Sequence, residues 1–219
     1  MNPFSDALKF LTANTGDYNA LGGWKYLILA IFYALIFGSL ALAIVNWRED
    51  ASQRTPRNLA LALVRILIGC MWFEGMLWKL PFSHDNGLYY WMQQMAGRAA
   101  FAWHRDLVAH VLLPNFELLN PIIFLAELGF AAALILGLFV RLASLVAIGF
   151  TLNLWLGIYQ NRGNDPAEWS WSYMFLALLL LMFILDAAGR ALGADAWLAR
   201  NIASVRDGQG LGRWAKLAG

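Results

Sequence analysis

The stretch PIIFLAELGFAAALILGLFVRLASLVAIGFTLNLWLGIY, residues 121–159, decides the fold of this chain. Its 39 residues include only two charged side chains, Glu127 and Arg141. A helix that spans a membrane needs about 20 mostly apolar residues, so this stretch is long enough for two. We predict spans at Pro121–Val140 and Leu142–Tyr159, joined at Arg141 as a tight antiparallel hairpin.

The rest of the chain has the same apolar character. Of its 219 residues 60% are hydrophobic and 14% charged, against about 45–50% and about 25% in soluble domains. Three more stretches are apolar enough to span: Tyr26–Asn46, Asn58–Leu80 and Trp171–Ala188. Tryptophans stand at several of their ends, where indole rings favour the headgroup level. The sequence therefore predicts an all-α, polytopic membrane helix bundle with five spans.

The distribution of basic residues predicts the orientation of these spans. With the N-terminus outside and the C-terminus inside, nine lysines and arginines face the cytoplasm and six face outward. Residues 1–57 then hold the first span and a basic cytoplasmic loop, and 58–200 hold a four-helix bundle. Within that bundle, 81–120 form an outer amphipathic segment rich in aromatic residues. Residues 201–219 form a basic cytoplasmic tail.

The sequence lacks the residues that several kinds of cofactor require. Cys70 is the only cysteine, which excludes an internal disulfide and cysteine-bound Fe–S clusters. No predicted span contains a histidine, which excludes a haem held by two histidines within the bundle, and no flavin fingerprint is recognisable. His84, His104 and His110 lack metal-ligand spacing, so no metal site is predicted. The net charge of +2 is too small to suggest nucleic acid.

Charged residues inside the spans are the candidate functional residues, because each costs at least about 2.5–3.5 kcal/mol near the bilayer centre. At 100° per residue, Arg65, Gly69, Trp72, Met76 and Lys79 form one stripe. Glu127, Ala131, Leu134, Leu138 and Arg141 form a matching stripe. Counting depth along antiparallel helices predicts an outer cluster of Glu74, Lys79 and Glu127. It also predicts an inner cluster of structural ion pairs made by Arg65, Arg141 and Asp186.

Alternatives remain for some of these residues. Glu74 points about 180° away from Arg65, so it faces another neighbour or its helix is kinked near Gly69 and Gly75. Asp186 has Arg190 as a second possible partner. Crowded carboxylates raise one another's pKa, so a member of the outer cluster can hold a proton for a quinone carbonyl. The predicted polar pocket comprises Arg65, Trp72, Glu74, Trp78, Lys79, Glu127 and Asn153.

Two weaker features concern helix packing. Gly129, Ala133 and Gly137 form a ridge of small residues, which predicts a close helix contact. Asn153 lies within a span, where it serves either an interhelical hydrogen bond or a ligand contact.

Four pieces of the sequence, in this order, resemble the DoxX/DoxD family of membrane proteins: Leu63–Gly69 with Glu74, Gly75 and Lys79; Ala126–Gly129 with Leu136–Ala143; Glu168–Ser172; and Ala188–Asp195. Family members are four-helix bundles, which makes the first span here an extra helix. The resemblance implies a polar pocket at Arg65, Glu74, Lys79, Glu127 and Arg141. DoxD-like proteins are similar to the membrane subunit of thiosulfate:quinone oxidoreductase, which works with a DoxA partner, and this chain has no DoxA-like region.

These observations favour two functions. The first is the quinone-binding component of a membrane oxidoreductase in the bacterial inner membrane, with a bound quinone and electrons from other membrane or periplasmic subunits. The second is a non-catalytic accessory subunit of a larger respiratory, photosynthetic or oxidase complex. A small-solute carrier is disfavoured, because the chain lacks an inverted repeat and a pair of broken helices.

Overall fold

The computed structural model describes residues 2, 4, 5, 8, 9, 21–81, 87–159 and 168–219. His84 of the predicted outer segment lies outside them. No strand occurs among the described residues. The helices, with η for 3-10 and π-helical turns, are α3 (Trp24–Glu49), η1 (Ala51–Gln53), α4 (Pro56–Met76), η2 (Leu77–Lys79), α5 (Gly87–Arg98), α6 (Ala102–Leu107), η3 (Val108–Leu112), η4 (Leu113–Asn115), α7 (Phe116–Leu136), α8 (Val140–Gly157), α9 (Glu168–Leu185), η5 (Ala188–Arg190), α10 (Ala194–Asn201), α11 (Ala203–Asp207) and α12 (Leu211–Ala218).

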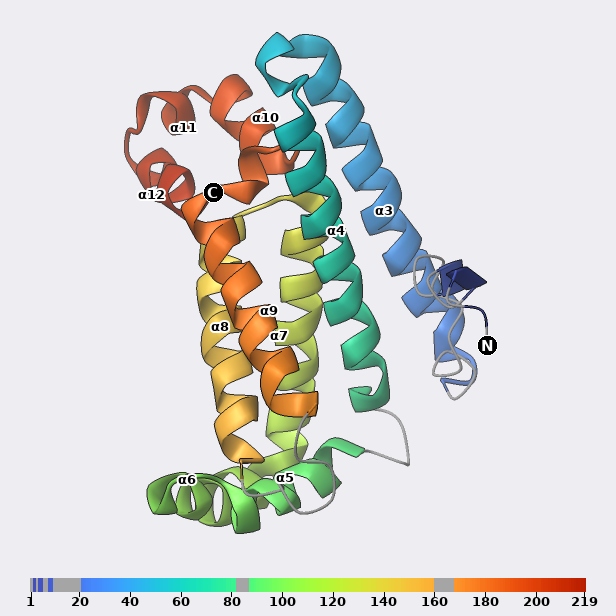
Figure 1. Ribbon diagram of the computed structural model, residues 1–219, viewed down its shortest axis with the longest axis vertical. Coiled ribbons are helices and arrows are strands. Elements are labelled where there is room, and N and C mark those ends of the chain that lie inside the picture. Colours follow the sequence, from blue (N-terminus) through green and yellow to red (C-terminus); the bar gives the residue numbers. More distant parts are fainter. Residues whose placement is uncertain (1, 3, 6–7, 10–20, 82–86, 160–167) are drawn as a thin grey trace. The chain divides into compact units, whose positions relative to one another are not determined.

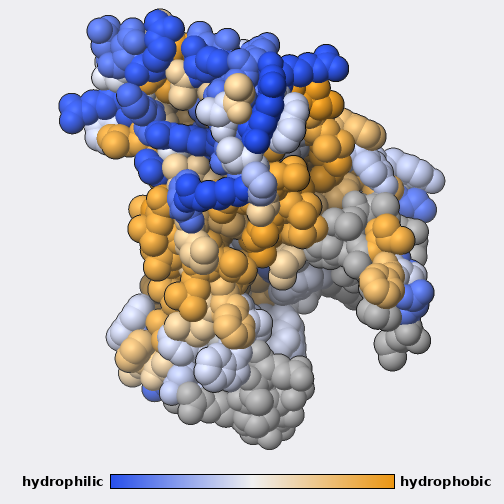
Figure 2. All heavy atoms as spheres, turned by 45° about the horizontal axis from the view of Figure 1, so that its top comes forward, coloured by the Kyte–Doolittle hydropathy of each residue, from blue (hydrophilic) through white to orange (hydrophobic). Residues whose placement is uncertain are grey.

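The predicted all-α membrane bundle is confirmed. Within the described part of the chain, four helical stretches are long and apolar enough to cross a membrane: Trp24–Glu49, Pro56–Lys79, Ala102–Leu136 and Val140–Gly157. Trp171–Leu185 is a shorter apolar helix where the fifth span is predicted. Figure 2 shows hydrophobic residues over the long helices and hydrophilic ones gathered at the end that holds α10 to α12.

The boundary between the third and fourth spans is a correction to the sequence analysis. The chain turns at Gly137–Phe139, and Arg141 lies inside the first turn of α8 instead of separating the two helices. Gly137 and Phe139 both have left-handed backbone conformations, with φ of 71° and 50°. Glycine adopts such a φ without steric cost, which suits Gly137 to end α7.

Two compact units make up the chain, and each is described by itself. The first contains Met1–Leu77, Glu127–Ser144 and Met182–Gly219. In it α3 packs on α4 through Phe32 and Phe73, whose ring centroids lie 5.0 Å apart, and Figure 1 shows these two helices side by side. The backbones of α4 and α7 approach so closely at Gly69 that a Cβ atom there would lie 2.9 Å from the backbone nitrogen of Ile135.

The second unit contains Trp78–Ala126 and Leu145–Leu181. In it α5 and η3 bury Leu88, Met92, Met95 and Val108 against Ile158, which follows α8. The linker after α5 is tied to the same helix end, because the amide of Ala100 donates a 2.8 Å hydrogen bond to the carbonyl of Leu156. The described part of the predicted amphipathic segment, residues 87–120, is therefore largely helical and packs its apolar face on the end of α8.

Candidate functional site

Arg65 lies in the middle of α4, and its side chain is completely buried. Its guanidinium donates hydrogen bonds to the carbonyl oxygens of Leu134 and, at 3.2 Å, Ile135. Both carbonyls belong to the last turn of α7, where backbone acceptors have no partner within the helix. A cation at this position also interacts favourably with the helix dipole. Arg65 therefore completes the hydrogen bonding at the C-terminal end of α7.

Asp195 completes the hydrogen bonding at the N-terminal end of the next helix, α8. Its carboxylate oxygens accept hydrogen bonds from the backbone amides of Phe139, at 2.8 Å, and Val140, at 3.2 Å, where α8 begins. In return the amide of Asp195 donates to the carbonyl of Gly137 at 2.8 Å. Burial raises the pKa of Asp195, against the opposing effects of these amides and of the Arg65 charge. One buried acid thus caps a helix that begins 55 residues earlier.

Glycines make this close approach possible. A Cβ atom on Gly137 would lie 2.6 Å from Nη1 of Arg65 and 2.7 Å from the Cα of Gly193. A Cβ atom on Gly189 would overlap the carboxylate of Asp195. The turn after α7 and the segment after α9 therefore pack around Arg65 and Asp195 with no room for another side chain.

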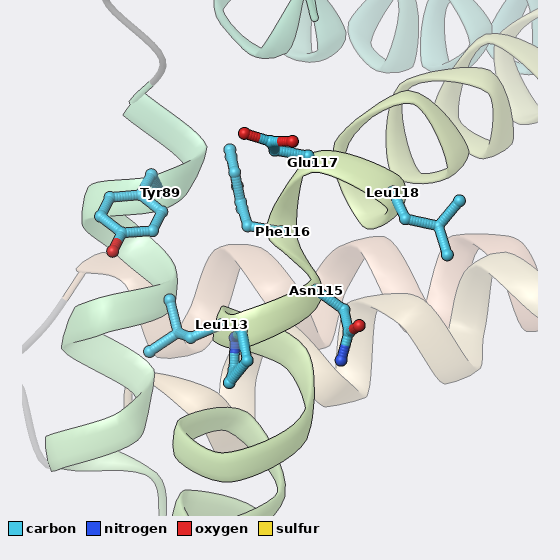
Figure 3. Close-up of a pocket in the computed structure, with 7 residues that line it drawn as sticks. Tyr89, Leu113, Asn115, Phe116, Glu117 and Leu118 are labelled. Atoms are coloured by element: carbon cyan, nitrogen blue, oxygen red, sulfur yellow. The ribbon is translucent and has the colours of Figure 1, made fainter.

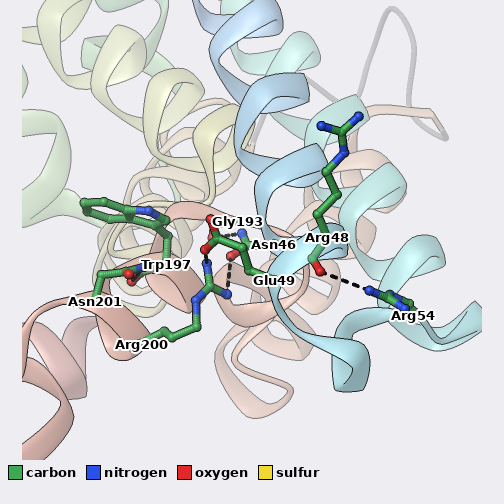
Figure 4. A network of polar contacts seen from close by, with 8 residues as sticks. All are labelled: Asn46, Arg48, Glu49, Arg54, Gly193, Trp197, Arg200 and Asn201. Atoms are coloured by element: carbon green, nitrogen blue, oxygen red, sulfur yellow. Dashed lines mark hydrogen bonds and ion pairs between the residues drawn. The ribbon is translucent and has the colours of Figure 1, made fainter.

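The end of α3 joins the same assembly through a polar network (Figure 4). Asn46 is fully buried, and its Nδ2 donates to the carbonyl of Gly193 at 2.8 Å. Arg200 donates to Oδ1 of Asn46 at 3.1 Å and forms a 2.7 Å ion pair with Glu49. Farther along, the amide of Leu192 donates to the side chain of Gln53 at 2.9 Å. The N-terminal helix is thus fixed to the segment that follows α9.

The residues predicted for the inner cluster have other partners in the structure. Asp186 forms an ion pair with Arg57, at the start of α4. Arg141 donates to the carbonyl of Ile184 at 3.1 Å. The acid whose charge acts on Arg65 is Asp195. Asp195 was not among the predicted site residues, although it closes the family-like piece Ala188–Asp195.

Asn46 was also missed, because a single asparagine near the end of an apolar stretch is a common feature of span boundaries. Its burial is the property that distinguishes it, and burial at this position depends on a contact with Gly193, 147 residues away. The sequence carries no local signal for such a contact.

Glu127 is the acid buried within α7. Only 1% of its surface is exposed, and it belongs to a buried face with Ala131 and Leu134. One turn along, the ring of Phe130 packs edge-to-face on Trp72 of α4, with centroids 5.1 Å apart. The first unit therefore contains a buried carboxyl group one helical turn from an aromatic pair.

The other predicted pocket residues are distributed over both units. Glu74, on α4 in the first unit, is half-buried. Lys79 belongs to the second unit, where it is 6% exposed and its ammonium lies 4.6 Å from the ring centroid of Trp78. Every residue of the predicted stripe from Arg65 to Lys79 is buried.

Asn153 hydrogen-bonds within the second unit to His104, which is buried and stacks on Trp103 with centroids 5.3 Å apart. This contact joins α8 to α6, which is the interhelical alternative for Asn153. A shallow pocket of about 420 Å³ also lies in this unit, lined by Tyr89 and by Leu113–Leu118 (Figure 3). Glu117 and Asn115 are its polar side chains, and neither was a predicted site residue.

The three small residues of the predicted ridge have different surroundings. Gly129 is exposed, and a Cβ atom there would meet no atom within 4 Å. Ala133 is half-buried. Gly137 lies in the turn after α7, where its close neighbours are Arg65 and Gly193.

Comparison with protein families places most of these elements in one known domain. Residues 60–160 match the DoxX family model, from α4 to just beyond α8. The match covers Arg65, Glu127 and the turn at Gly137, whereas α3 and Asp195 lie outside it. No curated protein and no solved structure matches the chain. The chain is therefore a multi-pass membrane protein whose residues 60–160 form a DoxX domain.

Proposed function

We propose that this membrane protein is the quinone-binding component of a membrane oxidoreductase. The observation that carries the proposal is the burial of Glu127 in α7, one turn from the aromatic pair Trp72 and Phe130. An ionisable side chain within a span is costly and is by default a candidate functional group. Its neighbours supply the apolar, aromatic surface that quinone rings favour.

A quinone site needs a hydrogen-bond donor for the carbonyl oxygens and access to lipid for the isoprenoid tail. A quinone takes up two electrons and two protons to become a quinol, so its carbonyl oxygens need a nearby hydrogen-bond donor. A carboxyl group within the apolar span at Glu127 is such a donor when protonated. The isoprenoid tail meanwhile stays in the lipid. This role places the chain in the membrane that holds the quinone pool, the bacterial plasma membrane.

The electrons come from a partner subunit under this proposal. The sequence has a single cysteine, Cys70, and no recognisable flavin or haem-binding pattern. A separate membrane or periplasmic oxidoreductase subunit therefore delivers the two electrons. The chain itself binds and orients the quinone and donates protons to its carbonyl oxygens.

Quinone quenching of tryptophan fluorescence, measured on the full chain in lipid nanodiscs, tests the proposal. Glu127→Leu keeps the approximate volume of the side chain and removes its hydrogen-bond donor, so we expect this variant to bind a short-chain ubiquinone about tenfold more weakly, the loss of one hydrogen bond of about 1.4 kcal/mol. Trp72→Phe should remove part of the quenching. Glu117→Leu is the matched control, because Glu117 is exposed on the same helix. Equal affinity of the native chain and the Glu127 variant would refute the proposal.

A second function, that of an accessory subunit, is favoured by α3. Of its 26 residues only Ile28, Phe32, Ser39 and Asn46 are buried. Its other apolar side chains are half-buried or exposed, although its end is fixed by the network at Asn46. Such a helix is suited to contact a partner subunit within the membrane.

Substitutions that keep α3 apolar can distinguish whether its exposed side contacts a partner protein or lipid. Phe37 and Leu40 are 65% and 50% exposed, and a Phe37→Ala/Leu40→Ala variant keeps the helix soluble in lipid while changing its shape. We expect this variant to lose co-migration with a larger complex on native gels. Unchanged migration, together with unchanged stability of the partner, would count against an accessory role for α3.

A further inference from the structure

The short C-terminal helix α12 carries an unusual concentration of exposed apolar side chains. Leu211, Trp214 and Leu217 are 88%, 71% and 57% exposed. They are spaced three residues apart, which on a helix places them within a sector of about 120°. The helix therefore has one continuous apolar face.

This face is turned away from the rest of the first unit. The opposite side of α12 packs on α11 at Gly212, where a Cβ atom would overlap the backbone of Ser204. Lys216 fixes the same contact, because its ammonium donates to the carbonyl of Arg206 at 3.1 Å. Since α12 is held by its small-residue side, its large apolar residues are not part of the protein core.

Contacts at the end of α12 place it where the spans leave the apolar layer. Gly219 lies against Asp195, the residue that caps the first amides of α8. Arg190, which follows the end of α9, donates to the carbonyl of Lys216 at 2.8 Å. The helix is thus level with the beginning of one span and the end of another.

The charge of this region supplies the remaining clue. Residues 201–219 contain three basic side chains and one acidic side chain, Asp207, and Arg213 is exposed between Leu211 and Trp214 on α12. Apolar residues flanked by basic ones are typical of helices that lie in the headgroup region of a membrane. Basic residues near an anionic membrane surface are attracted to it.

We propose that α12 is an interfacial helix that inserts Leu211, Trp214 and Leu217 into the headgroup region and binds anionic phospholipids through Arg213. The interaction is independent of the proposed quinone site. It anchors the segment after α9 to the leaflet beneath it, and through Asp195 and Asn46 this segment holds α7, α8 and α3 together.

Spin labels on the full-length protein test this placement. In a Cys70→Ala background, single labels at Leu217→Cys and at Gln209→Cys are compared in nanodiscs of phosphatidylcholine alone and with phosphatidylglycerol in equal part. Gln209 is exposed just before α12 and is the matched control. We expect the label at position 217 to be more accessible to oxygen than to a water-soluble nickel chelate, and the label at 209 to show the reverse.

The role of charge is tested in the same preparation. Arg213→Gln should lower the membrane-inserted fraction at position 217 about fivefold in the anionic discs, with a smaller effect in phosphatidylcholine alone. Equal nickel access at positions 217 and 209 in both lipids would overturn the proposal. A label at 217 that is shielded from both reagents would also overturn it, because a protein partner would then cover the face. Thermal melting checks that each labelled variant folds.

Discussion

Replacing Asp195 with alanine is the sharpest test of how this bundle is held together. The carboxylate of Asp195 accepts hydrogen bonds from the amides of Phe139 and Val140, and its charge acts on the buried Arg65. Alanine removes both acceptors and the charge at once. The first turn of α8 then loses its cap, and Arg65 keeps only the backbone carbonyls as partners.

The expected cost is large for a single residue. Loss of a helix N-cap costs about 0.5–2 kcal/mol, and each amide left buried without a partner costs about 1–3 kcal/mol. Partial relaxation of the turn reduces the total, so we expect Asp195→Ala to lower the free energy of unfolding by about 3 kcal/mol. Asp195→Asn should cost less, about 1 kcal/mol, because one acceptor remains and a buried charge is removed.

Unfolding by sodium dodecyl sulfate in mixed micelles, followed by circular dichroism, measures these differences. Asp207→Ala is the matched control, because Asp207 forms an exposed ion pair with Arg206 that contributes less than about 1 kcal/mol. Hydrogen exchange should show loss of protection at the amides of Phe139 and Val140 in Asp195→Ala. If these amides stay protected and the alanine variant is as stable as the control, the cap does not hold α8 in the way described.

Three further predictions concern the same assembly. Arg65→Lys should lower the free energy of unfolding by about 2 kcal/mol, because one ammonium cannot reproduce the forked contacts of a guanidinium; a melting curve equal to the native one would contradict this. Gly137→Ala should cost about 3 kcal/mol through its positive φ and the contact with Arg65, whereas Gly129→Ala, in open space, should change stability by less than about 1 kcal/mol. Burial raises the pKa of Asp195 above 3.8, so the folded chain keeps a proton that the unfolded chain has released. The stability of the native protein relative to Asp195→Asn should therefore fall as pH rises just above 3.8 and then level off, and a difference that rises with pH there would be evidence against the stated effect of burial.

The spans could be predicted because they depend on local properties of the chain. An apolar run of about 20 residues forms a membrane helix whatever its neighbours are. The helical period likewise placed Glu127 on a face with Ala131 and Leu134, and that face is buried. These features need no knowledge of distant residues.

The break between α7 and α8 could not be placed in the same way. Arg141 is the only charged residue near it, and a charge at a span end is the usual local signal. The actual break depends on Gly137 and on Asp195, whose carboxylate holds the first amides of α8 from 55 residues away. The predicted partner of Arg65 was Asp186, because the two residues lie at similar depth in their spans. Depth along a span does not indicate that the chain folds back after α9 and brings Asp195 to the bundle.

Arg65 and Glu127 are both buried within spans, yet their different surroundings favour different roles. Arg65 donates hydrogen bonds to carbonyl oxygens at the end of α7 and to that of Ala191, and it interacts with the charge of Asp195. Its desolvation is offset by groups that the fold needs to satisfy in any case, which makes Arg65 a structural residue. Glu127 instead lies on the apolar face of α7, one turn from an aromatic pair. Burying an ionisable group within a span is costly, which makes Glu127 the candidate for the ligand-binding role proposed above.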